Sequence, residues 1–417
     1  MGPDSEMNLP GYLRKLSVCL FGLFFGTGAM AEDSPLVLYL DADFTGTRAA
    51  GLAIERGIRT ALSENGDRLG GHPVELVVRD HRGSSPRSRA HLDEFLADSR
   101  ALAVFSGLHS PPLLAHRDFI NANAILVLDP WAAAGPITRP PGDENWIFRL
   151  SVDDSKAGQV IARHAIRTDG FRRPFLLLEE TGWGRSNRKT MTEALAAMGI
   201  EPAGLLWFNW GVGDHEARRL LGTIAATDAD VVFLVANAPE GKTFARAMIE
   251  LPEGARLPIR SHWGITGGDF AEQIDAAMRA KLDLEFIQSR FSFIDHGEHP
   301  IAERVLQRAR DLFPDAIETA RDIHAPAGFI HAYDLTRLLD AAVNQAGLTG
   351  DIVHDRAQVR RALESLQQPV QGLVKVYNKP FSVYSPDSAR DAHEALGPKD
   401  WALGRYGDRG EILLDRQ

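Results

Sequence analysis

Short runs of apolar residues alternate with longer amphipathic stretches along most of the chain. Short apolar runs bounded by turn residues favour buried strands, and stretches with apolar positions three and four apart favour helices. Strands are expected at 36–40, 74–78, 102–105, 125–128, 175–178, 204–208, 231–235 and 259–261. Helices are expected at 47–63, 86–97, 187–198, 215–225, 241–251, 300–312 and 329–345.

This alternation predicts an α/β fold with two doubly wound units in succession, each built on a parallel sheet that is covered by helices. Ligands of such sheets bind outside the carboxyl ends of the strands. The residues that directly follow each expected strand are therefore the first place to look for a functional site.

The N-terminus has the features of a secretory signal peptide. Arg14 and Lys15 precede an apolar run at 16–25, and the small-x-small triplet Ala29-Met30-Ala31 follows. The export machinery and signal peptidase recognise these three features, and the run is too short to span a bilayer. We therefore expect cleavage after about Ala31, a mature chain that begins near Glu32, and a periplasmic location.

The single cysteine of the chain, Cys19, lies within this apolar run. One alternative is a lipoprotein anchored through Cys19, although Val18 is large for the position before a lipidated cysteine. Met7 is an alternative start that leaves the export signal intact. Removal of the signal leaves a mature chain without thiols or disulfides, which an oxidising compartment permits.

The chain has 417 residues and a formal net charge of −10. Without its signal it is still too long for one core and suits two lobes of ordinary domain size. An acidic chain lacks the electrostatic footprint for binding phosphate backbones, so we expect no nucleic-acid partner. No later segment reaches transmembrane length, and we expect a monomer.

Two motifs suggest nucleotide or metal binding, but neither meets its structural requirement. Residues 236–243 fit a permissive phosphate-loop pattern, but Pro239 removes a backbone donor from the loop and Glu240 repels phosphate. The stretch His296-Gly297-Glu298-His299 is expected on a solvated loop, and zinc needs three or four converging ligands. The chain also lacks a Gly-x-Ser-x-Gly elbow. We therefore expect a binding protein with no catalytic residue, no metal and no cofactor, and not an enzyme.

Several segments contain or follow the expected strands, at 41–46, 104–110, 125–130, 148–150, 180–184 and 230–234. In their order and spacing they resemble the leucine/isoleucine/valine-binding-protein family, the type I periplasmic binding proteins of branched-chain amino acid ABC transporters. The resemblance extends over nearly the whole mature chain. It implies two lobes that close about a hinge around a small-molecule ligand, in a form that a partner recognises.

The resemblance also implies domain boundaries and a partner. Crossings between the lobes are expected near 150–153, 284–292 and 371–383. Lobe 1 then holds 35–150 plus about 290–370, and lobe 2 holds about 151–289 plus about 371–417. The implied fold class is thus α/β with two doubly wound lobes and a three-strand hinge. The implied partner is an inner-membrane ABC permease, or alternatively a membrane sensor protein that reads the same closure.

In this family a serine, a threonine and backbone amides bind the ligand carboxylate, and an acidic residue binds the ammonium. Ser110 matches the serine position, where hydroxyl and amide donors at a helix N-terminus suit an anion. Ala133 stands at the threonine position, and Trp131 stands where the family has a small residue. The resemblance therefore implies a carboxylate site that lacks one of its usual donors.

Three further positions complete the site that the resemblance implies. Trp263 stands where the ammonium-binding acid is expected, Trp183 where the family usually has tyrosine, and Asn237 at another cleft position. Aromatic faces favour flat rings and cations, so we expect an aromatic or cationic ligand in place of an aliphatic amino acid. The alternative is that the tryptophans pack as core beneath the loops.

Three carboxylates also lie near the ends of expected strands, namely Asp43, Asp129 and Glu180. Each can pair with a cation at such a position. The ordinary role of a carboxylate there is to cap a helix or to lie in a solvated loop, and both interpretations stay open on the sequence alone.

Overall fold

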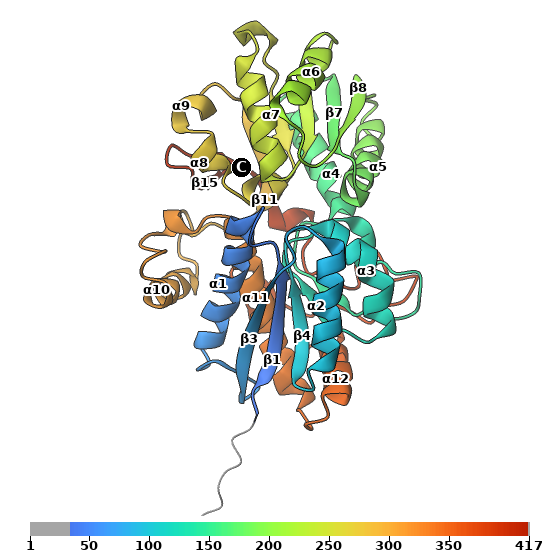
Figure 1. The fold of residues 1–417 in the computed structure, drawn as a ribbon, viewed down its shortest axis with the longest axis vertical. Helices are drawn as coiled ribbons and strands as arrows, with labels where there is room; N and C mark the ends of the chain where they lie inside the picture. The colour runs from blue at the N-terminus through green and yellow to red at the C-terminus, as the bar shows by residue number, and fades with distance from the viewer. Residues whose placement is uncertain (1–33, 416–417) are drawn as a thin grey trace, which may run out of the picture. The chain divides into compact units, whose positions relative to one another are not determined.

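The structure is a computed structural model that describes residues 34–415, and its strands form two large sheets (Figure 1). The first sheet, with the helices that pack on it, is called lobe 1 below. Its six strands have the order β2-β3-β1-β4-β5-β6. Their bounds are β1 Leu36–Ala42, β2 Arg68–Leu69, β3 His72–Asp80, β4 Ala101–Ser106, β5 Val127–Asp129 and β6 Ile147–Arg149. All neighbours pair in parallel except β2 and β3.

The second sheet and its helices are called lobe 2, and its seven strands have the order β15-β14-β11-β10-β9-β7-β8. Their bounds are β7 Pro174–Glu179, β8 Gly204–Phe208, β9 Val231–Val235, β10 Ile259–Ser261, β11 Leu284–Ser289, β14 Trp401–Tyr406 and β15 Ile412–Leu414. Neighbouring strands from β7 to β11 are parallel, whereas β14 runs antiparallel to β11 and to β15. A separate ribbon pairs β12 Val370–Gln371 with β13 Val376–Tyr377.

The helices pack in pairs, with α1 along α11 and α2 along α3 in lobe 1, and α4 along α5 and α6 along α7 in lobe 2. Helix α1 approaches α11 closely at Gly57, where a Cβ would lie 2.3 Å from the carbonyl oxygen of Phe329. The bounds are α1 Arg48–Ser63, α2 Ser85–Ala97, α3 Ser110–Ala122, α4 Asp154–Arg163, α5 Gly182–Ala196, α6 Asp214–Ala225, α7 Ala238–Glu250, α8 Phe270–Gln273, α9 Ala276–Arg279, α10 Ala302–Leu312, α11 Pro326–Ala346 and α12 Ile352–Glu364. The α/β class expected from the alternating pattern is confirmed.

Strands β8, β9 and β10 have the bounds that the sequence predicts. The helix expected at 187–198 begins earlier, because the Thr181 hydroxyl accepts a hydrogen bond from the amide of Gly184 and caps α5. Trp183 therefore lies in the first turn of a helix and not in a loop. Its position is fixed by the cap.

Some features of the fold differ from the expectation. Helix α3 has no range among the expected helices, although Ser110 is expected at a helix N-terminus, and its first turn carries Pro111 and Pro112. Proline fits there, since the first amides of a helix have no intrahelical acceptor. The sheets are also not wholly parallel, because β2 and β3, and likewise β14 and β15, are joined by short turns that impose antiparallel pairing.

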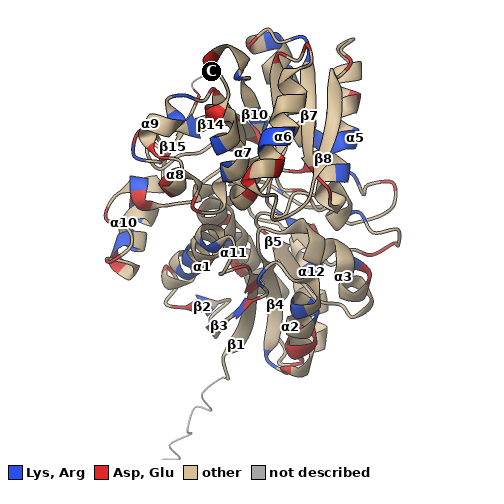
Figure 2. Ribbon diagram, turned by 45° about the horizontal axis from the view of Figure 1, so that its top comes forward, with Lys and Arg blue, Asp and Glu red and all other residues tan. Residues whose placement is uncertain are grey.

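Three remaining expectations concern the N-terminus, membrane-spanning helices and the distribution of charge. The expected signal peptide, its cleavage near Glu32 and Cys19 lie outside the described residues. Among the helices at 34–415, none combines the length and the apolar character needed to cross a membrane. Figure 2 shows basic and acidic residues interspersed on the helices, as on α2, where Arg89 pairs with Asp93 at 3.1 Å.

Candidate functional site

A small cavity lies between loops that follow strands of both sheets. Lobe 1 contributes the loops after β4 and β5, and lobe 2 contributes those after β7, β9 and β10. The lining residues are Leu108, His109, Ser110, Pro111, Trp131 and Ala133 from lobe 1, and Trp183, Asn237, Trp263 and Gly264 from lobe 2. The structure thus brings together every residue that the sequence analysis assigned to the ligand site.

The three tryptophans of the cavity are buried and interact with aromatic neighbours. Trp263 of lobe 2 packs on Trp131 of lobe 1 with ring centroids 5.3 Å apart, and on His331 of α11 at the same distance. Trp183 meets His262 edge to face at 5.1 Å. These indoles therefore pack as core and line the cavity at the same time, so the two interpretations of the sequence do not exclude each other.

Ser110 and Ala133 lie side by side in the lining. Ser110 is the first residue of α3, and its Oγ accepts a hydrogen bond of 3.2 Å from the amide of Ala134. Ala133 adds only a methyl group, so the loop after β5 offers no hydroxyl at this point. The polar donors on the lobe 1 side are then the Ser110 hydroxyl, the ring of His109 and the indole N–H of Trp131.

On the lobe 2 side, Asn237 precedes α7 and turns its amide group to a buried carboxylate. Its Nδ2 donates a hydrogen bond of 3.0 Å to Oε2 of Glu179, whose Oε1 accepts from the Thr181 hydroxyl. Burial raises the pKa of Glu179 to about 7, although these hydrogen bonds favour its charged form. Glu179 holds Asn237 in place and does not itself line the cavity.

No carboxylate lines the cavity, and the carboxylates near strand ends serve other purposes. Asp129 accepts hydrogen bonds from the Ser106 hydroxyl and from two amides of the loop that it begins. Asp43 accepts two amides of its own loop and lies 3.0 Å from Nε2 of His109, whereas Glu180 is exposed. These groups shape loops or face solvent, so an ammonium group finds no acid in the lining.

Several buried polar atoms of the lining have no hydrogen-bond partner among the described residues. They include Nε1 of Trp131, Nε1 of Trp183 and Nδ1 of His109, all from lining residues. An unsatisfied buried donor or acceptor costs about 1–3 kcal/mol, and native proteins almost always supply a partner. A ligand with hydrogen-bonding atoms at its edge provides such partners at this place.

The size of the cavity limits what enters without movement. Its volume is about 10 Å³, which suits a single water molecule. A ligand with an aromatic ring is much larger. Such a ligand enters only when Trp263 withdraws from Trp131 or when the lobes separate.

Gly264 closes one wall of the cavity and gives a direct test of the packing there. A Cβ at this position would lie 2.8 Å from Oδ1 of Asn237, from Cη2 of Trp183 and from the carbonyl oxygen of Ala236. We expect Gly264→Ala to lower the free energy of unfolding by about 1–3 kcal/mol, as overpacking does. Urea denaturation measures this change.

The matched control is Gly222→Ala on α6, where nothing lies within 4 Å of an added Cβ. Alanine is the better helix former, so this variant is expected to gain about 0.5–1 kcal/mol. Equal effects of the two substitutions would contradict the tight wall at Gly264.

Several residues of the lining were not predicted from the sequence. His109 lies next to Ser110 and is buried, with Nε2 held by Asp43. The signal for His109 was its place in the strand-end segment 104–110. Leu108, Pro111 and Gly264 carry no chemical signal in the sequence, because apolar residues and glycine are common in every loop.

Metal binding has one geometric candidate among the described residues, and it does not line the cavity. His164, Asp169 and Glu285 converge in lobe 2. Nε of Arg260 lies 2.7 Å from Asp169 and 3.2 Å from Glu285, so a guanidinium already pairs with both carboxylates. The group fits an ion-pair network better than a metal centre.

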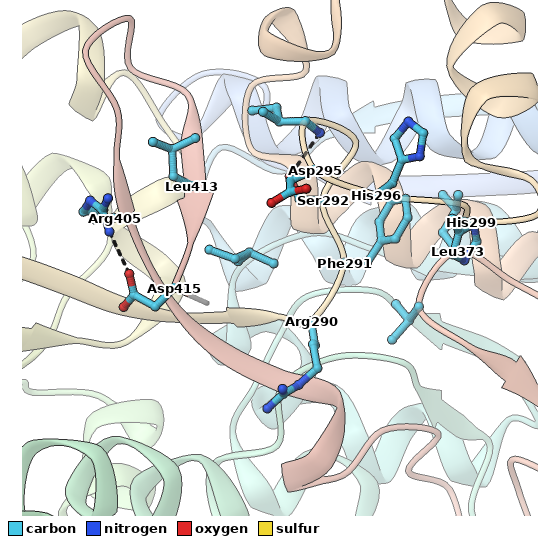
Figure 3. Close-up of a pocket in the computed structure, with 13 residues that line it drawn as sticks. Arg290, Phe291, Ser292, Asp295, His296, His299, Leu373, Arg405, Leu413 and Asp415 are labelled. Atoms are coloured by element: carbon cyan, nitrogen blue, oxygen red, sulfur yellow. Dashed lines mark hydrogen bonds and ion pairs between the residues drawn. The ribbon is translucent and has the colours of Figure 1, made fainter. Parts of the chain in front are cut away.

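A larger groove of about 780 Å³ is lined by the loop after β11, by Leu373 and Val374 and by β14 and β15 (Figure 3). His296 and His299 of the His-Gly-Glu-His stretch lie in this groove. Arg405 pairs with Asp415 at 2.8 Å on one side of the groove. None of these described lining residues has a buried polar atom without a partner, so the groove lacks the unmet hydrogen bonds that mark the small cavity.

Comparison with known proteins identifies the family. The sequence profile of the periplasmic binding protein family matches residues 40–393. A type 1 periplasmic binding protein from Bordetella pertussis has a TM-score of 0.74 at 15% identity, covering 92% of this chain and 100% of that one. No curated protein sequence shows a significant match.

The names of two other similar solved structures state what those proteins bind. A solute-binding protein of an ABC transporter from R. palustris, crystallised with benzoate, has a TM-score of 0.72 at 18% identity, covering 91% of this chain and 95% of that one. A leucine-binding protein from Thermotoga maritima has a TM-score of 0.71 at 16% identity, covering 91% and 98%. At such identities the likeness establishes the fold alone, and it confirms the type I two-lobed architecture.

The family match extends over most of the chain and agrees with the expectation of a binding protein that is not an enzyme. It also accounts for the placement of the cavity between two sheets, at the carboxyl ends of their parallel strands. The chain belongs to the periplasmic binding protein family.

Proposed function

We propose that the protein captures a small aromatic carboxylate between its lobes and delivers it to an ABC importer. The lining of the cavity carries this proposal. Three indoles offer faces for a flat ring, and the Ser110 hydroxyl and the free indole N–H groups offer donors to a carboxylate. No acidic side chain lines the cavity to repel that carboxylate.

An aliphatic amino acid fits this lining poorly. Trp263 stands where the family holds the ammonium with an acid, so leucine loses a charge-assisted hydrogen bond worth about 1.5–3 kcal/mol, or about tenfold or more in affinity. Ala133 also lacks the hydroxyl that usually contacts the ligand carboxylate. Solved relatives of this fold hold benzoate or 4-hydroxybenzoate, which supports an aromatic acid.

Capture requires the lobes to move, because the cavity holds about 10 Å³. We propose that 35–150 with about 290–370 move as one body and that about 151–289 with about 371–417 move as the other. The mature chain is proposed to begin near Glu32, in the periplasm, and to meet an inner-membrane permease in its closed form. A membrane sensor as partner is the alternative, and permease and ATPase genes next to this one would favour import.

Calorimetry with benzoate, leucine and choline tests the ligand class. We expect benzoate to bind, and Trp183→Ala and Trp263→Ala each to weaken it by about tenfold, because each removes an aromatic contact to the ring. Trp207→Ala, on β8 and outside the lining, is the matched control and is expected to leave the affinity unchanged.

The other two probes decide between ligand classes. Choline is a quaternary amine that three indoles can hold through cation–π contacts, and tight choline binding without benzoate binding would replace the aromatic acid by a cation. Micromolar leucine binding that survives both tryptophan substitutions would show that these residues are not the site.

A further inference from the structure

The loop between β8 and α6 carries a tryptophan with an unusual environment. Trp210 is 39% exposed, whereas the tryptophans of the cavity are at most 5% exposed. Its ring lies 5.2 Å from the ring of His109, tilted by 48°. Its Cζ3 is also 3.5 Å from the position of a Cβ on Gly83. Trp210 belongs to lobe 2, whereas His109 and Gly83 belong to loops of lobe 1, so this side chain bridges the lobes at the surface.

The loop that carries Trp210 is held firmly on lobe 2. Gly211 has a φ of +72°, which turns the chain directly after Trp210. The amide of Gly211 donates a hydrogen bond of 2.9 Å to Oε1 of the buried Glu240. The side chain of Trp210 also hydrogen-bonds the carboxyl group of Glu179. These hydrogen bonds fix the loop on lobe 2. The position of the Trp210 ring therefore does not depend on its contact with lobe 1.

The two residues that Trp210 contacts, His109 and Glu179, are both connected to the cavity. His109 lines the cavity directly, and Glu179 holds the lining residue Asn237 through a hydrogen bond of 3.0 Å. Trp210 itself is not part of the lining. It therefore lies at the rim, between the lining residues and solvent, where the two lobes meet.

We infer that Trp210 is the lid of the cavity: its ring covers the seam between the lobes at His109 and limits how fast molecules enter and leave. The role of a lid in ligand exchange rests on the proposed function, but the covering of the seam does not. A lid slows both directions of exchange, whereas a side chain that touches the ligand slows only release.

A thiol placed inside the cavity measures the covering without any ligand. Ser110 is 4% exposed, so the variant Ser110→Cys in a Cys19→Ser background reacts with iodoacetamide only when the site opens. We expect the added substitution Trp210→Ala to raise the alkylation rate about tenfold. Trp210→Phe keeps a ring over His109 and is expected to restore the slow rate.

The matched control is Val212→Ala, on the same loop, whose side chain packs against the core of lobe 2. It is expected to leave the alkylation rate unchanged. An unchanged rate in Trp210→Ala, or a fast rate in Trp210→Phe, would overturn the assignment of the ring as lid. The thermal midpoint is expected to fall in Trp210→Ala, because the hydrogen bond to Glu179 is lost. Trp210→Phe loses the same bond and controls for that fall.

Stopped-flow mixing with benzoate then tests ligand exchange. We expect Trp210→Ala to raise the association and dissociation rates of benzoate together, by about tenfold, and to change the equilibrium affinity much less. A rise in the dissociation rate alone would make Trp210 an ordinary ligand contact and overturn the lid. If the wild type does not bind benzoate, the proposed function fails while the alkylation rates still decide the lid.

Discussion

Replacing Arg149 by methionine is expected to lower the free energy of unfolding by about 3–5 kcal/mol, the usual cost of breaking a buried ion pair. The Arg149 side chain is fully buried at the end of β6. It donates to both carboxylate oxygens of Glu394, at 2.9 and 2.6 Å, and to Asp153 at 3.1 Å. Methionine leaves the Glu394 carboxylate buried and without its main partner. Urea denaturation measures the loss.

Arg149 also positions the candidate site. Its Nη1 donates to the carbonyl oxygens of Ala132 and Ala134, at 3.2 and 2.9 Å, which flank Ala133 of the lining. Arg149 does not line the cavity, so its substitution acts there only through the loop after β5. We expect this loop to shift and the affinity for benzoate to fall. The matched control is Arg405→Met, whose pair with Asp415 is solvent-exposed and worth about 0–1 kcal/mol. Equal losses in the two variants would refute the buried network.

The strands and helices could be predicted because their signals are local. The apolar runs that predict β8, β9 and β10 need no information from elsewhere in the chain. The pairing of Arg149 with Glu394 has no such signal, since the two residues are 245 positions apart. Sequence alone therefore marks 148–150 as a segment of interest without showing what Arg149 does.

The candidate site, too, could be predicted from the sequence only in part. The resemblance places Trp131, Trp183 and Trp263 at strand ends, and the structure brings them to one cavity. That Trp263 packs on Trp131 across the lobes, and so leaves room for only one water, depends on how the two sheets meet. Trp210 was not predicted as part of the site, because it follows β8, an edge strand of its sheet. The resemblance implies no ligand contact there.

Asp129 gives the stability of the protein a specific dependence on pH. Its side chain is fully buried at the end of β5, and burial raises its pKa to about 7 against the attraction of Arg149 and the hydrogen bonds from Trp131 and Ser106. The unfolded chain releases this proton near pH 4, whereas the native state keeps it up to about pH 7. The stabilisation is therefore complete below about pH 4 and is lost as the pH rises towards 7.

Other buried groups titrate in the same range, so the difference between two variants isolates Asp129. Burial lowers the pKa of His331 to about 4, which makes stability rise with pH over part of this range and opposes the effect of Asp129. In Asp129→Asn the position carries no proton to lose. We therefore expect its free energy of unfolding to increase relative to the wild type by up to about 4 kcal/mol between pH 4 and pH 7, since each unit of pKa shift is worth about 1.4 kcal/mol.

Urea denaturation at several pH values gives this difference directly. Asp118→Asn, on a side chain that is 81% exposed, is the matched control, and its free energy of unfolding is expected to stay within about 0.5 kcal/mol of the wild type at each pH, as for most surface substitutions. A constant difference for Asp129→Asn as well would mean that the carboxyl of Asp129 is already charged at pH 4, held so by Arg149 and by the amides of the loop that carries Trp131.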